Sequence, residues 1–412
     1  MRQVVQRSKI EALGALAFAG SALALALTAP WSAAVPVETS SSPGTVEPAV
    51  APASTPAPVE RPVIDVVFVL DTTGSMSGLL EGAKQKIWSI ANTIASGQPQ
   101  PQLRVGLVAY RDRGDAYVTQ TTPITEDLDE VYGALSQLDA NGGGDFPEHL
   151  NAGLKTAIRD TQWSTGANTL KMVFVVGDAP PHDDYDPSLT SAHLAAEAMA
   201  RGIVLNAVQC GNDARTRAVF ERFAAAANGE FMAIAANGGV SMIATPFDEE
   251  LARLNTALGD LGLDYGGHAM KARGGAKKRR RKAMRAGTAA DAASYGAKKK
   301  GLYKEDLVTA IREGDVTLDS LSDEELPTGL AGKSRAEQQK MLESNMVKRE
   351  ALRAQIRALS RQRDTFLEEE KAARAAAAPA PGALGGEASE GFDDTVKRAV
   401  RTSAKDLGIE YK

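Results

Sequence analysis

The sequence has few of the residues that build disulfide frameworks or histidine-based sites. It contains one cysteine, Cys210, among 412 residues, so an intramolecular disulfide is impossible. A lone cysteine at the end of an apolar strand is typical of a small buried hydrophobe. The four histidines show neither metal-ligand spacing nor a Ser/His/Asp arrangement suited to nucleophilic catalysis, and they are His149, His182, His193 and His268.

A strong overall charge bias is also missing. The formal net charge is −5, so nothing in the total charge points to a nucleic-acid partner, and we expect none. Basic residues gather locally in "KKRRRK" at 277–282. This run could bind anionic lipid or a cell-envelope polymer, or it could be a solvated linker.

A long apolar run stands near the start of the chain, at 13–29, after Arg2, Arg7 and Lys9. Small residues follow it up to Ala34. This order predicts a secretory signal peptide at 1–34, with an uncleaved membrane anchor as the alternative. Either places the rest of the chain outside the cytoplasm, in the periplasm, at the cell surface or secreted. No cysteine follows the run, which argues against a lipoprotein.

Composition then divides the chain into further segments. Residues 35–60 are rich in Pro, Ser and Thr and predict a solvated linker. Residues 61–265 alternate apolar strand-like runs with amphipathic helical segments, which predicts an α/β fold around a doubly wound, mostly parallel sheet. Residues 266–301 are basic and predict a linker, and 302–412 predict a mainly α-helical region.

Within that last region, Ser334 and Glu337 form a capping-box pattern that opens a long helix ending near residue 378. Its apolar positions recur at spacings of three and four residues. Arg349 and Arg363 interrupt this seam, so the coiled-coil signal is weak.

Polar residues follow the ends of apolar strands in the α/β region. Asp71, Thr73 and Ser75 stand in "DTTGSM" directly after "VIDVVFVL", and Asp178 ends "VVGD". Asp145 stands in "NGGGDFPEH". The carboxyl ends of parallel strands share one edge of a sheet, so these loops could converge there. Oxygen-only donors suit a hard cation, Mg²⁺ or Mn²⁺, better than zinc.

Each of these residues also has a purely structural interpretation. Asp71 or Thr73 could cap the first helix, and Asp145 with Glu148 fits a capping box. Asp178 could be a turn residue before Pro180 and Pro181. All three features in this order are less expected by chance than any one alone.

Together "VVFVLDTTGSM", "NGGGDFPEHLNAGL" and "FVVGDAPPH" resemble a von Willebrand factor type A (vWA) domain with its metal-ion-dependent adhesion site, over roughly 61–258. "YRDRGD" at 110–115 resembles the loop after the second strand in bacterial members. The resemblance implies a Rossmann-like fold, with Asp71, Thr73, Ser75, Asp145 and Asp178 at the metal. It also implies a binding function, in which the metal accepts an acidic side chain from a partner protein.

Asp145 departs from the family pattern, which has Thr at that place. A third carboxylate beside Asp71 and Asp178 makes a site with Mg²⁺ net negative. We expect such a site to hold metal more tightly and to attract an acidic ligand less. A purely structural metal is therefore an alternative to an adhesive one.

The first functional hypothesis is thus an exported binding or assembly module rather than an enzyme. Binding through the basic segment or the helical tail, with a structural metal, is the alternative. A Mg²⁺-dependent phosphatase is a weaker rival, because Thr73 occupies the place of the second carboxylate in a D-x-D motif.

Overall fold

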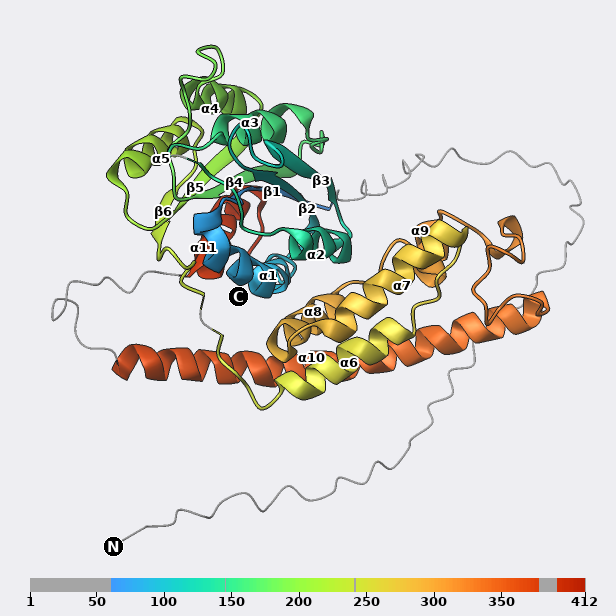
Figure 1. Ribbon diagram of the computed structural model, residues 1–412. Helices are drawn as coiled ribbons and strands as arrows, with labels where there is room; N and C mark the ends of the chain where they lie inside the picture. The colour runs from blue at the N-terminus through green and yellow to red at the C-terminus, as the bar shows by residue number, and fades with distance from the viewer. Residues whose placement is uncertain (1–60, 145, 241, 378–390, 412) are drawn as a thin grey trace, which may run out of the picture. The chain divides into compact units, whose positions relative to one another are not determined.

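The computed structural model describes residues 61–411 except 145, 241 and 378–390 (Figure 1). The signal or anchor predicted at 1–34, the linker predicted at 35–60 and Asp145 lie outside the described residues. In the part that is described, no helix combines the length and apolar character needed to cross a membrane.

A six-stranded sheet in the order β3-β2-β1-β4-β5-β6 forms the centre of the α/β region. Only the β2–β3 pair is antiparallel, and the other pairs are parallel. The strands are β1 (Val63–Asp71), β2 (Gln102–Tyr110), β3 (Thr119–Thr125), β4 (Thr169–Gly177), β5 (Ile203–Cys210) and β6 (Phe231–Ile234).

Both faces of the central strands β1, β4 and β5 are buried, as a near-continuous apolar strand requires. Along β1, Ile64, Val66 and Phe68 pack into one core cluster, while Val67 and Val69 pack into a second. The helices that contribute to the first cluster are α1 (Ser77–Ile94), α2 (Leu128–Gln137), α8 (Ala286–Lys298) and α11 (Phe392–Ser403), and those of the second are α3 (Leu150–Lys155), α4 (Ser191–Ala200) and α5 (Ala214–Ala226). The predicted α/β fold with a mostly parallel, doubly wound sheet is confirmed.

Short helical turns join some of these elements. They are η1 (Gly74–Met76) before α1, the π-helical turn η2 (Thr156–Asp160) after α3, η3 (Leu318–Ser320) and η4 (Ala404–Leu407).

The expected helical region has cores of its own. Leu254, Ala293 and Ile356 share one cluster, and Tyr265, Leu307 and Leu342 belong to another. The helices are α6 (Asp248–Asp260), α7 (His268–Ala283), α8 (Ala286–Lys298), α9 (Leu307–Glu313) and α10 (Arg335–Ala377).

The prediction of a linker at 266–301 is wrong, because this segment forms α7 and α8. In α8 every residue from Thr288 to Ala297 is buried. Four basic side chains of the 277–282 run also form ion pairs within the chain, which explains why a basic helix can pack here. They are Lys277 with Asp127 and Glu305, Lys278 with Asp264, Arg281 with Asp129, and Lys282 with Asp260. This pairing argues against binding of an anionic polymer or lipid, which the sequence allowed as one of two interpretations of this run.

The prediction of one helical region over 302–412 also needs correction. Helix α11 lies beside α1 against the sheet, and the ring of Phe392 lies 6.0 Å from that of Phe68 in β1 (Figure 1). The backbone of Gln98 pairs with that of Glu410 as an isolated antiparallel bridge. The α/β layer is therefore completed by the last residues of the chain, and α6 to α10 are inserted before them.

The strand order reverses between β1 and β4. The chain moves from β1 to β2 on one side of the sheet, whereas β4 pairs with β1 on the other side. Loops leaving the carboxyl ends of such strands diverge and leave room for a ligand between them. The loops after β1 and β4 carry Asp71 and Asp178.

Candidate metal centre

Asp71 ends β1 with its side chain fully buried. One carboxylate oxygen, Oδ1, accepts hydrogen bonds from the Thr73 amide at 2.9 Å and the Thr73 hydroxyl at 2.7 Å. The Thr73 hydroxyl also lies 3.4 Å from that of Ser75. Within the described part of the chain, the other oxygen, Oδ2, has no hydrogen-bond partner. Three of the predicted metal-site residues are therefore in contact with one another.

The helix-cap interpretation of Thr73 is not supported. Thr73 stands at the N-cap of η1, but its side chain makes no capping hydrogen bond. Its hydroxyl proton goes instead to Asp71. Thr73 thus orients the carboxylate rather than the helix.

Asp178 follows β4, beside Asp71. A Cβ on the preceding Gly177 would lie 2.5 Å from the Tyr110 hydroxyl and 3.4 Å from Asp71 Oδ2, so glycine permits this close approach. Burial raises the pKa of Asp71 to about 7, and repulsion from Asp178 contributes, although the hydrogen bonds from Thr73 lower it. The hydroxyl of Thr216 in α5 fixes the Asp178 loop by donating to the Asp178 carbonyl at 3.1 Å.

Asp145 lies outside the described residues, but the structure brings Glu148 of the same loop to the site. A Cβ on Gly143, which has a φ of +78°, would lie 2.8 Å from Glu148 Oε1 and 3.0 Å from Thr73 Cβ. The Glu148 amide donates to the Pro180 carbonyl at 3.1 Å, and the His182 amide donates to the Glu148 carbonyl at 3.0 Å. Glu148 therefore connects the loop before α3 with the loop after β4.

Glu148 is a buried carboxylate in an acidic environment. Burial, followed by repulsion from Asp71, Asp112, Asp115 and Asp178, raises the pKa of Glu148 to about 8. Its Oε2 atom has no hydrogen-bond partner among the described residues. The sequence interpretation missed this role, because Glu148 was considered only as the second half of a capping box with Asp145. Since α3 begins at Leu150, Glu148 precedes the helix and cannot be its third residue.

The loop after β2 adds two more carboxylates that sequence reasoning did not assign to the site. Asp112 is buried, and its Oδ2 accepts a hydrogen bond of 2.8 Å from the Tyr185 hydroxyl, while Oδ1 has no partner in the described part. Asp115 accepts from the Gly143 amide at 3.0 Å. The only signal in the sequence was the likeness of "YRDRGD" to the second loop of vWA domains.

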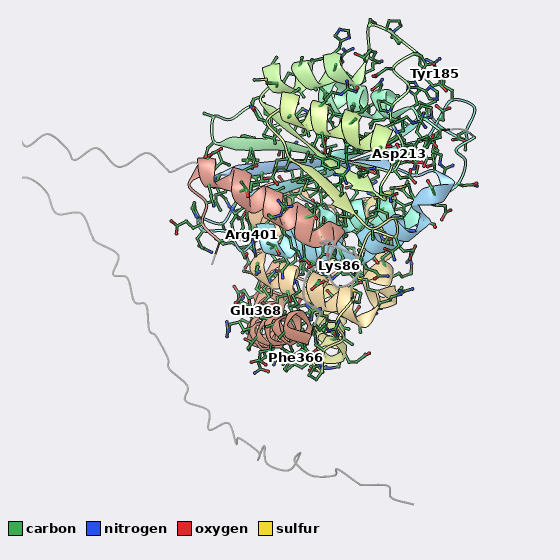
Figure 2. The ribbon with its side chains drawn as sticks, turned by 90° about the vertical axis from the view of Figure 1, so that its left-hand side faces the viewer. Lys86, Tyr185, Asp213, Phe366, Glu368 and Arg401 are labelled. Carbon is green, nitrogen blue, oxygen red and sulfur yellow. The ribbon has the colours of Figure 1, made fainter. Side chains whose placement is uncertain are left out.

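An aromatic and basic rim adjoins these carboxylates. The ring of His182 stacks on Tyr185 at 3.9 Å, and the guanidinium of Arg113 lies 4.0 Å from the centre of the Tyr185 ring. Figure 2 shows Tyr185 remote from Phe366 and Glu368 of α10. The rim therefore belongs to the α/β layer and not to the inserted helices.

These residues pass a chemical test for a hard cation. Buried carboxylate oxygens without partners carry a large desolvation cost unless a cation or a proton compensates them. Such oxygens occur on three loops, at Asp71, Asp112 and Glu148. No three Asp, Glu, His or Cys side chains of the described residues form a group able to hold a metal on their own. A cation at this place would therefore need the hydroxyls of Thr73 and Ser75 as additional donors.

Comparison with known proteins agrees with this architecture. A family model for the von Willebrand factor A domain matches residues 65–246. Human von Willebrand factor A domain-containing protein 7 is 32% identical over 124 residues, which cover 30% of this chain and 13% of that protein. The alpha-protein kinase vwkA of Dictyostelium discoideum is 27% identical over 120 residues, covering 29% and 19%.

Two solved structures are also similar at low identity. The SpRpn10 VWA domain aligns with a TM-score of 0.34 at 15% identity, covering 42% of this chain and 89% of that one. Proximal thread matrix protein 1 from the mussel byssus aligns with a TM-score of 0.33 at 14% identity, covering 43% of each chain. The family match leads to one conclusion: residues 65–246 form a von Willebrand factor A domain, a kind of domain that generally mediates interactions between proteins.

Proposed function

We propose that the vWA domain binds a partner protein through Mg²⁺ or Mn²⁺ held at the carboxyl edge of its sheet. Asp71, Thr73 and Ser75 would hold the ion, with Asp178 and Glu148 beside them. The observation that carries the proposal is the set of buried carboxylate oxygens, at the end of β1 and on two adjoining loops, that have no hydrogen-bond partner among the described residues. When bound, the cation would supply a positive centre that accepts a carboxylate from the partner.

The extra acidic residues define what kind of metal site this would be. Asp112, Asp115 and Glu148 add negative charge around Asp71 and Asp178. More carboxylates favour a divalent cation, but they repel an incoming acidic side chain. Asp145 would act in the same direction, and its effect stays a prediction.

A structural metal is the second candidate, and the interlocking of the loops favours it. The Gly74 amide donates to the Gly142 carbonyl at 3.2 Å, and the Asn141 amide donates to the Thr72 carbonyl at 3.0 Å. A cation at this point would clamp the loops in place. The partner would then bind to the rim around Arg113 and Tyr185.

Export and the absence of catalysis are further parts of the proposal. Export rests on the order of basic, apolar and small residues at 1–34 alone. Mass spectrometry of the N-terminus of protein from the cell envelope or medium tests it, and a full-length chain in the cytosol would count against it. Hydrolysis of a generic phosphate ester with Mg²⁺ present would contradict the non-catalytic role.

The metal proposal is tested by thermal melting of the full chain with and without Mg²⁺. Bound cation stabilises the folded state by mass action, so the melting temperature should rise with Mg²⁺. Asp71→Asn and Glu148→Gln should reduce this rise. An unchanged response in both variants would show that the cation binds elsewhere.

Glycines 143 and 144 provide a matched pair for the same experiment. Gly143→Ala places a Cβ against Glu148 and Thr73 at a positive φ, whereas the Cβ of Gly144→Ala would have nothing within 4 Å. We expect weaker Mg²⁺ binding only in the first. Mg²⁺-dependent capture of an acidic peptide by the wild-type chain supports the adhesive form, and stabilisation by Mg²⁺ without capture supports the structural form.

A further inference from the structure

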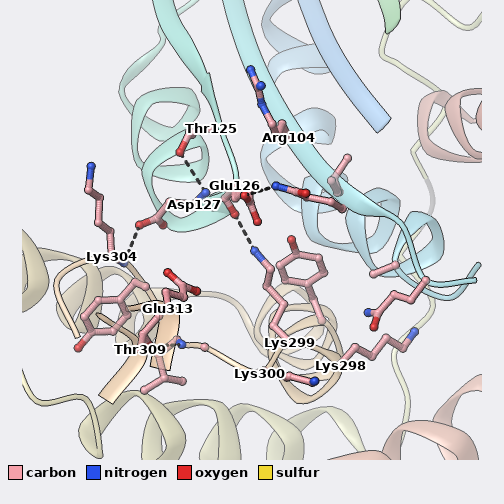
Figure 3. Close-up of a pocket in the computed structure, with 18 of the residues that line it drawn as sticks. Arg104, Thr125, Glu126, Asp127, Lys298, Lys299, Lys300, Lys304, Thr309 and Glu313 are labelled. Carbon is pink, nitrogen blue, oxygen red and sulfur yellow. Dashed lines mark hydrogen bonds between the residues drawn. The ribbon is translucent and has the colours of Figure 1, made fainter. Parts of the chain in front are cut away.

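A cleft of about 930 Å³ opens between the α/β layer and the inserted helices, away from the candidate metal centre (Figure 3). One wall includes Gln102 at the start of β2 and Thr125 at the end of β3. Because β2 and β3 are antiparallel, both residues lie at the amino edge of the parallel sheet. The other wall is the segment from Tyr295 in α8 to Asp315 after α9. The volume lies in the range of small-molecule sites.

The lining of this cleft is rich in cations. Seven basic side chains line it, which are Arg61, Arg104, Lys298, Lys299, Lys300, Lys304 and Arg312. Four carboxylates line it too, namely Glu126, Asp127, Glu313 and Asp315. Asp127 is already paired with Lys277, and Arg104 with Asp65. Six cations therefore face three carboxylates.

These six cations have no carboxylate partners within ion-pair distance among the described residues. Four bind carbonyl oxygens instead: Arg61 those of Gln100 and Pro101, Lys298 that of Asn92, Lys299 that of Glu126, and Arg312 that of Lys300. The ammonium groups of Lys300 and Lys304 have no hydrogen-bond or ion-pair partner in the described part, and both residues are exposed. Burial lowers the pKa of Lys298, and attraction to the Asp364 carboxylate offsets only part of this effect.

Stabilisation of the α8 C-terminus does not account for this arrangement. Cations interact favourably with the last turn of a helix, and Lys298 lies there. Lys300 and Lys304, however, lie beyond the end of α8, and Arg312 comes from α9. The end of α8, the loop after it and α9 thus each place basic residues at the same cleft.

We propose that this cleft is a binding site for a small polyvalent anion, a compact ligand that carries at least two phosphate or carboxylate charges. Such a ligand would lie between Lys300, Lys304 and Arg312 on one wall and Arg61 on the other. It would neutralise cations contributed by both the α/β layer and the inserted helices. The proposal is independent of the metal centre.

Isothermal titration of the full chain with pyrophosphate, and separately with citrate, tests the proposal. Protein and buffer are treated with a chelating resin beforehand, so that metal binding by the anions does not contribute. The variant Lys300→Gln/Lys304→Gln should bind about tenfold more weakly or worse, because two nearby charges are lost. Binding should also weaken with added salt.

The matched control is Lys340→Gln/Lys348→Gln, which removes the same charge from exposed positions on α10. We expect wild-type affinity in this control and unchanged melting temperatures in both variants. Binding of pyrophosphate alone supports a phosphate ligand, binding of citrate alone supports a carboxylate ligand, and binding of both supports recognition by charge. No binding of either anion at millimolar concentration, or equal loss in the control, would overturn the proposal.

Discussion

Asp71 and Glu148 are acids whose pKa values are raised in the folded chain, to about 7 and about 8. In the unfolded chain both groups lose their protons near pH 4. Between these limits the folded state holds more protons than the unfolded state. The contribution of these two groups to the free energy of unfolding of the metal-free protein should therefore be largest at low pH. It should fall as the pH rises toward 8.

We predict that metal-free protein melts at a higher temperature at pH 6 than at pH 8, and that Mg²⁺ reduces this difference. The slope is at most about 1.4 kcal/mol per pH unit for each proton involved. Glu148→Gln should flatten the profile, because its amide does not titrate, whereas Glu343→Gln at an exposed position of α10 should not. A profile for Glu148→Gln that matches the wild type would contradict this account.

The candidate site was predictable only in part, and the reason lies in the range of the interactions. Asp71 and Asp178 could be placed because the apolar strands before them end abruptly. Glu148 and Asp112 could not, since their positions depend on Gly143 and on Tyr185, which is 73 residues away from Asp112. No local pattern reports such contacts between loops.

At the level of elements, α11 is the helix whose role was least visible in advance. The sequence predicted a mainly α-helical region at 302–412, and the structure has a helix at Phe392–Ser403 within it. The sequence pattern could not say that Phe392, Val396 and Val400 pack into the core of the vWA sheet. Sequence periodicity gives the apolar face of a helix, but not the surface that will cover it.

Phe392→Ala should destabilise the whole α/β layer. The side chain is 1% exposed, and its truncation leaves a cavity beside Phe68, at a cost of about 3–5 kcal/mol. Urea denaturation measures the change. Val347→Ala, at a position that is 72% exposed, is the control and should be nearly neutral. Equal effects of the two substitutions would mean that α11 does not contribute to the core.

Helix α10 was predicted well in its bounds and poorly in its packing. It starts after Ser334, whose hydroxyl bonds Glu337 at 2.7 Å as the capping box requires. Arg349 and Arg363 were expected to interrupt an apolar seam. Instead Arg349 pairs with Asp306, and Arg363 with Asp248 and Asp291, all within the chain. Buried ion pairs replace the apolar contacts of a coiled coil at these positions.

At the scale of the whole molecule, two buried ion pairs, Lys277 with Asp127 and Arg281 with Asp129, connect the inserted helices with the vWA domain. Arg281 of α7 donates to both carboxylate oxygens of Asp129 in α2, at 2.9 and 2.6 Å. The guanidinium carbon also lies 5.9 Å from the centre of the Trp88 ring in α1. This contact joins segments 152 residues apart in sequence.

Breaking this pair from one side should cost more than replacing both partners. We predict that Arg281→Met alone destabilises the chain by about 3–5 kcal/mol, because Asp129 is left buried and unpaired. Arg281→Met with Asp129→Leu should recover much of that loss. Urea denaturation of the two single variants and the double variant forms the cycle. Strict additivity would show that the two side chains do not interact.

The position of α11 also affects how the protein is made. Domains generally fold as units, from the N-terminus onward, while the chain leaves the ribosome. Here the domain that begins at residue 61 lacks one part of its core until Phe392 and the residues after it have been synthesised. The inserted helices α6 to α10 therefore emerge while the first domain is still incomplete. A premature stop or a proteolytic cut near residue 391 would consequently damage the N-terminal domain first, although the inserted helices α6 to α10 lie between that domain and the lesion in the sequence.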